Sequence, residues 1–241
     1  MINREGYNTY AANINSAAMS KTFIANVFSW MLIALGITAT ISYYVATTPE
    51  LLRHMINVET GGMSILGYII VFAPLGLVFL MNLGYQKLSA KALSVIFIIY
   101  SILMGASLSF IFLIYTGSSI AITFGVTAAT FGVMAILGYT TRTDLTKFGS
   151  ILIMALVGII IASLVNLFLH SEAINYIISI IGVLVFTGLT AYDVQKLKRI
   201  GAGVEFGAEN TRKLTILGAL TLYLDFINLF LFLLRFLGDR K

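Results

Sequence analysis

Residues 92–141 read ALSVIFIIYSILMGASLSFIFLIYTGSSIAITFGVTAATFGVMAILGYTT, fifty consecutive positions without a charged side chain. About 20 apolar residues, at a rise of about 1.5 Å each, cross the hydrocarbon core of a bilayer. The stretch is therefore too long for one membrane helix and long enough for two. Its middle holds YTGSS at positions 115–119, a cluster of turn-forming residues. We predict two membrane-spanning helices joined by a tight hairpin.

The rest of the chain has the same character. Hydrophobic residues make up 59% of the 241 positions and charged residues 10%, whereas soluble domains carry about 25% charged residues. This composition predicts an all-α integral membrane protein. We expect a polar cytoplasmic N-terminal segment at residues 1–22 and a single seven-helix transmembrane domain at residues 23–241. The seven helices are predicted at residues 23–46, 61–84, 92–115, 119–139, 148–169, 173–195 and 212–236.

The basic residues indicate the orientation of the chain in the membrane. The predicted spans place eleven Lys and Arg residues on one side and four on the other. Because basic residues are enriched on the cytoplasmic side, the N-terminus is predicted to be cytoplasmic and the C-terminus to be outside. The net charge of +5 is then a topology signal and does not point to nucleic-acid binding.

Motifs of soluble enzymes and of secreted proteins are missing from the sequence. It contains no cysteine, no His-Glu-x-x-His motif, no Gly-x-Ser-x-Gly motif and no Walker loop. The glycines of GAGVEFG at 201–207 have the wrong spacing for a nucleotide-binding loop and predict a flexible cytoplasmic loop. Residues 1–20 do not resemble a cleavable signal peptide. These observations favour a non-enzyme without a cofactor, in a bacterial inner membrane.

Two acidic residues differ from the other charged residues because they lie inside long apolar runs. Asp193 ends the run GLTAYD, and Asp225 lies within LYLDFIN. A carboxylate at hydrocarbon depth costs about 3 kcal/mol or more and usually handles an ion or a proton. Because all fifteen Lys and Arg residues lie outside the apolar runs, neither acid has an obvious basic partner at its own depth, and each is expected to have the other as its partner.

Two carboxyl groups that meet in a low-dielectric site share a proton and titrate as a unit, because ionising both is costly. Such a pair would sense protons. It also offers oxygen ligands to a hard cation such as Ca²⁺, with Asn228 one helical turn from Asp225. The alternative is a protonated pair that only holds two helices together. Further candidates for supporting polar groups are Tyr192, Gln195 and Lys87.

Helix geometry sets a condition on this pairing. Asp193 lies three residues before Lys196, and Asp225 lies twelve residues after Lys213. If both lysines mark the same depth, the acids differ by about 13 Å of helix rise. Contact between them requires the last helix to begin well below the membrane surface, with residues 202–208 folded back to reach it.

Four segments resemble the Bax inhibitor-1 (transmembrane BAX inhibitor motif) family. GLTAYDVQKLK at 188–198 and LYLDFINLF at 222–230 are similar to its hallmark region. YTTRTDL at 139–145 and VNLFL at 165–169 are similar to its bacterial members. The resemblance runs from about residue 23 to the C-terminus and implies six helices around a central C-terminal one.

The resemblance also implies a role for the two acids. Asp193 and Asp225 match the family's di-aspartyl pH sensor, whose protonation state gates a leak of cations, chiefly Ca²⁺. In some members a basic residue of the second helix latches to the first of these aspartates. The second span here has no basic residue, and Lys87 lies at its cytoplasmic end.

Two other function classes stay open at this point. Some bacterial relatives modulate a membrane-bound AAA protease, which suggests a regulator that does not transport ions and contacts its partner through residues 1–20 or the glycine-rich loop. A proton-coupled transporter is the third class. It would be expected to show an inverted repeat, and the two halves of this chain show no convincing similarity.

Overall fold

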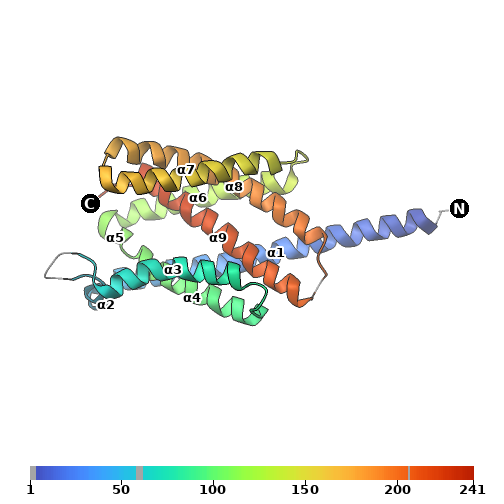
Figure 1. The fold of residues 1–241 in the computed structure, drawn as a ribbon, viewed down its shortest axis with the longest axis horizontal. Helices are drawn as coiled ribbons and strands as arrows, with labels where there is room; N and C mark the ends of the chain where they lie inside the picture. Colours follow the sequence, from blue (N-terminus) through green and yellow to red (C-terminus); the bar gives the residue numbers. More distant parts are fainter. Residues whose placement is uncertain (1–3, 58–61, 206) are drawn as a thin grey trace.

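The computed structural model describes residues 4–57, 62–205 and 207–241. Helices dominate this part of the chain (Figure 1). They are α1 (Arg4–Ala46), α2 (Pro49–Met55), α3 (Ile65–Gly84), α4 (Ala90–Leu108), α5 (Ile111–Ile114), α6 (Gly117–Thr140), α7 (Thr146–Leu169), α8 (Glu172–Ala202) and α9 (Glu209–Leu237). Seven helical segments in the described residues are long and apolar enough to cross a membrane, which confirms the predicted all-α membrane fold.

The hairpin predicted in residues 92–141 forms close to its predicted position. α4 ends at Leu108, the short α5 follows, and α6 begins at Gly117. Thr116 caps α6, since its hydroxyl accepts a hydrogen bond from Ser119 N at 3.3 Å. The interruption at Ser109 was not predicted. There the Ser109 hydroxyl donates to the carbonyl of Ala106 at 2.6 Å, a local bond that competes with the helical pattern.

Several helices extend beyond the predicted spans. α1 is helical from Arg4, so the predicted N-terminal segment continues into the first span without a break in the described part. α8 was predicted to end at residue 195 but continues through Ala202. Part of the reason is that Ser20 Oγ in α1 donates to the carbonyl of Lys198 at 2.8 Å, which holds the extra turns of α8 against α1.

α9 is the most buried of the spans. In its most apolar window 67% of residues are buried, compared with 17% in α3 and α7. It runs obliquely through the bundle and packs against α1, α4, α6 and α8 (Figure 1). α3 packs mainly on α4, and α7 on α8. A full ring of six helices around α9 stays a prediction.

Small residues bring α8 close to its neighbours. A Cβ added to Gly138 of α6 would lie 2.2 Å from the carbonyl oxygen of Ala191 in α8. A Cβ added to Gly149 of α7 would lie 2.4 Å from the Tyr192 ring. Small residues let membrane helices approach closely, because packing holds them together in lipid. These contacts determine where the middle of α8 lies, and with it Asp193.

Candidate functional site

Asp193 of α8 and Asp225 of α9 meet inside the transmembrane bundle. Their carboxyl groups lie within hydrogen-bonding reach of each other. Both residues are buried, with exposed fractions of 9% and 5%. The lysines used to compare the depths of the two acids do not mark the helix ends, because α8 continues to Ala202 and α9 begins as early as Glu209.

The pair lacks the donors that usually satisfy buried carboxylates. Asp225 Oδ2 is buried and accepts no hydrogen bond from any N–H or hydroxyl group in the described residues. In the same part of the chain the only ion pair joins Arg199 to Asp144, so neither aspartate is in a salt bridge. The Asp193 carboxyl can donate a hydrogen bond to Asp225 only when it carries a proton, which supports the predicted sharing of one proton.

A basic side chain lies closer to the pair than the sequence indicated. Lys196 is attracted electrostatically to Asp193, one turn away on α8, and lines the same cavity. Its Nζ lies 6.0 Å from the centroid of the Tyr192 ring. Lys196 is thus a charged neighbour of Asp193 that the sequence did not single out, although the two side chains form no ion pair. The predicted helix ended at residue 195 and so placed Lys196 in a loop. The spacing of three residues between Asp193 and Lys196 nevertheless indicates that both side chains lie on one face of a helix.

The two aspartates lie in a groove between α7 and α9. The groove has a volume of about 610 Å³, and α8 contributes to its lining. Its walls are mostly apolar, with Leu164 on α7 and Phe232 on α9 among them. The candidate supporting residues Tyr192 and Asn228 line it as well. The Asn228 side-chain nitrogen donates to the carbonyl of Leu224 at 2.8 Å, which leaves its oxygen as an acceptor.

The two other candidate supporting residues lie elsewhere. Gln195 is buried and binds the α6–α7 loop: its Oε1 accepts from Leu145 N at 2.9 Å, and its Nε2 donates to the Thr143 carbonyl at 2.8 Å. It cannot also support Asp193, because side chains two residues apart on a helix do not share a face. Lys87 is exposed in the α3–α4 turn and does not line the groove.

The α6–α7 loop is also tied to α8 by a charged contact. Arg199 Nη2 lies 2.6 Å from Asp144 Oδ1, and its Nη1 donates to the Thr146 hydroxyl at 2.9 Å. Hydrogen bonds from Thr146 and Arg199 hold the pKa of Asp144 well below its ordinary value. This polar cluster fastens the loop beside α8 on the predicted cytoplasmic side.

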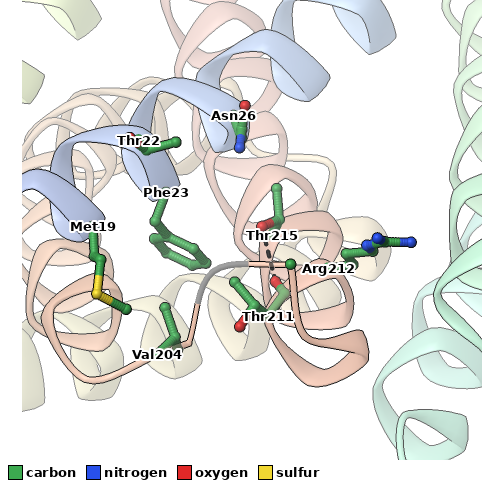
Figure 2. A pocket seen from close by; sticks show the side chains of 9 residues that line it. Met19, Thr22, Phe23, Asn26, Val204, Thr211, Arg212 and Thr215 are labelled. Atoms are coloured by element: carbon green, nitrogen blue, oxygen red, sulfur yellow. Dashed lines mark hydrogen bonds between the residues drawn. The ribbon is translucent and has the colours of Figure 1, made fainter.

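The glycine-rich segment after α8 lies against α1. A small pocket of about 210 Å³ is lined by α1, by Val204 and Gly207 of this segment, and by the start of α9. Figure 2 shows Phe23 pointing from α1 toward Thr211 and Val204. Gly207 has a φ of 81°, a conformation that favours glycine. The described residues Val204 and Gly207 of this segment therefore lie beside α1.

Calcium binding by the pair stays a prediction. Ca²⁺ takes six to eight oxygen ligands, and two carboxylates supply at most about four. Within the described residues, no group of three or more His, Cys, Asp or Glu side chains is placed to hold a metal. A bound cation would need the Asn228 oxygen or water to complete its shell, which suits passing cargo better than a resident ion.

Comparisons with known proteins support the resemblance seen in the motifs. The chain is 49% identical over 222 residues to the inner membrane protein YbhL of Escherichia coli K12, covering 92% of this chain and 93% of that protein. It is 47% identical to an uncharacterized protein of Borreliella burgdorferi, covering 91% and 92% of the two chains. It is 41% identical to the uncharacterized protein RP147 of Rickettsia prowazekii, covering 96% and 98%.

The family model described as inhibitor of apoptosis-promoting Bax1 matches residues 20–241. This range includes both aspartates, the last six spans and the first span except its first two residues. The helical membrane fold, the relatives that align over nearly the whole chain and the family match all agree. The chain therefore belongs to the Bax inhibitor family.

Proposed function

We propose that this protein is a multi-pass protein of a bacterial inner membrane that leaks cations, chiefly Ca²⁺, and that the Asp193–Asp225 pair gates the leak according to its protonation. The name of the Escherichia coli relative supports the inner membrane as its location. The observation that carries the gating role is the contact between two buried carboxyl groups from α8 and α9.

Proton sharing provides a physical means of gating. With one proton between them, the carboxyl groups form a hydrogen bond that holds α9 against α8. Loss of that proton leaves two like charges in a low-dielectric site, and their repulsion drives the helices apart. The separated carboxylates then present oxygen ligands to a passing cation. Acid would close this path and alkali would open it.

A latch from the second span has no support here. α3 carries no basic residue and packs on α4, away from the aspartates. Lys196 is the basic residue near the pair. We propose that the positive charge of Lys196 attracts the Asp193 carboxyl away from Asp225 and so favours opening, a role opposite to that of a latch.

Calcium uptake into proteoliposomes at a series of pH values tests the proposal. Asp193→Asn and Asp225→Asn should each flatten the pH dependence of uptake, because neither variant can form the like-charged pair. Glu172→Gln is the matched control, since it removes an exposed acid from the same helix α8. If both Asp variants keep the wild-type pH profile, the pair only holds helices together and the gating role is wrong.

A regulator of a membrane-bound protease is the second candidate. The observation that favours it is the length of α1, whose backbone is helical from Arg4, well before the charge-free apolar run that begins at Thr22 (Figure 1). Deleting residues 2–16 tests it and preserves the contact between Ser20 and Lys198. Loss of co-purifying protease with calcium uptake intact would favour the regulator. Retained partner binding would count against it.

A further inference from the structure

The groove that holds the aspartates is open along its side. α7 and α9 both pack on α8, but they make no comparable contact with each other. The groove-lining residues Ile160, Leu164 and Leu167 of α7 are 51%, 58% and 65% exposed. Since all three helices are membrane spans, this opening faces the hydrocarbon of the bilayer.

The groove combines apolar walls with unused oxygen acceptors. Asp225 Oδ2 is buried without a donor, and the Asp193 carboxyl lies beside it. Asn228 Oδ1 is a third acceptor lining the groove. A buried acceptor without a donor is costly, and the cost is recovered when a ligand donates to it. The chemistry of the groove therefore calls for a cationic donor with a hydrocarbon tail.

We propose that this groove binds an amphiphilic primary amine, with its ammonium group on Asp193, Asp225 and Asn228 and its hydrocarbon tail along α7. A primary ammonium has three N–H donors, which can serve these three acceptors together. The negative charge of a pair that shares one proton balances the positive charge of the ligand. The ligand enters from the bilayer, so binding does not depend on calcium conduction.

The chain carries an ammonium group of its own at this groove. Lys196 lines it and is attracted to Asp193, yet its Nζ donates no hydrogen bond to either aspartate. Its positive charge competes with that of the ligand. Lys196→Gln should therefore bind the amine more tightly, whereas Asp225→Asn should bind it about tenfold more weakly or worse, the effect of losing a charge-assisted hydrogen bond.

Equilibrium binding of radiolabelled decylamine to the full chain in phosphatidylcholine nanodiscs tests the site. We expect saturable binding that the neutral analogue decanol does not displace. Two tryptophan variants on α7 test the tail-binding wall. Leu164→Trp fills the groove and should weaken binding, whereas Ile161→Trp, at a residue that is equally exposed but outside the groove, should not.

Carbodiimide labelling gives an independent readout of access from the bilayer. The carboxyl oxygen bonds to the central carbon of the reagent and its proton moves to a reagent nitrogen, which leaves an adduct detectable by mass spectrometry. Lipid-soluble dicyclohexylcarbodiimide should label Asp193 or Asp225. With decylamine present, the bound amine should displace dicyclohexylurea from the activated carboxyl, so the adduct should be replaced by the decylamide of the same aspartate. A water-soluble carbodiimide should label them far less.

The results separate this inference from the proposed leak. If decanol competes as well as decylamine does, or Asp225→Asn and Leu164→Trp bind like the wild type, the amine site is wrong even if calcium uptake keeps its pH response. If uptake shows no pH response while decylamine binds and is coupled to an aspartate of the pair, the leak proposal is wrong and the amine site stands.

Discussion

The carboxyl group of Asp225 in α9 lies within hydrogen-bonding reach of the carboxyl group of Asp193 in α8, and one of its oxygens has no donor in the described residues. This arrangement is satisfied only while the two groups hold a proton. We therefore expect the contact between α8 and α9 to depend on pH, which would link the stability of the bundle to its proposed gating.

Asp225→Asn should stabilise the protein in alkali. The amide can donate to Asp193 and removes the like charge, so it recovers about 1–3 kcal/mol, the cost of an unsatisfied buried polar group. The difference in stability between the variant and the wild type should become smaller in acid, where the wild-type pair regains its proton. Thermal unfolding in detergent at several pH values measures this, with Glu172→Gln as the control. A variant less stable than wild type in alkali would contradict the arrangement.

Gln195→Leu should loosen the α6–α7 loop. The change removes both hydrogen bonds to the loop backbone and leaves Leu145 N and the Thr143 carbonyl without partners, at a cost of about 1–3 kcal/mol. Hydrogen exchange of residues 141–146 should become faster, while carbodiimide labelling of the aspartates stays unchanged. The exposed Gln86→Leu is the control. Equal exchange rates in both variants would show that Gln195 does not hold the loop.

Asp144 should keep its loop ordered well into acid. Thr146 and Arg199 lower the pKa of Asp144 in the folded protein. The contribution of Asp144 to the stability of the loop is therefore complete above the ordinary Asp pKa of about 3.9 and is lost only as the pH falls through the lower pKa of the folded state. Hydrogen exchange in this loop should therefore show no added opening down to about pH 4. Asp144→Asn should speed exchange at neutral pH with little change in global stability, because the pair is exposed. Opening of the wild-type loop well above pH 4 would contradict this.

Gly138→Ala should destabilise the contact between α6 and α8. The new methyl group would meet the Ala191 carbonyl oxygen at 2.2 Å, so the helices must separate, which costs about 1–3 kcal/mol. Gly132→Ala on the same helix is the control, since a Cβ there meets nothing within 4 Å. Thermal unfolding of the two variants gives the comparison. An unchanged Gly138→Ala variant would mean that this close approach is not required.

The spans were predictable because the feature that defines them is local in sequence. A run of about 20 apolar residues has the length of the hydrocarbon core, whatever its neighbours are. Helix ends depend on more distant contacts. The last turns of α8 are held by the bond from Ser20 to Lys198, and no local pattern at residues 196–202 shows it. For that reason Lys196 was predicted to lie in a loop and not in the helix.

The sequence by itself determined that the chain crosses the membrane through seven helices and that Asp193 and Asp225 lie where a charge is costly. Only the tertiary structure decided that the two acids meet, that Lys196 and Asn228 share their groove, and that Gln195 faces the α6–α7 loop. The physical reason is that hydropathy sets the depth of a helix in the bilayer, whereas its rotation and tilt depend on packing against other helices, such as Gly138 on Ala191.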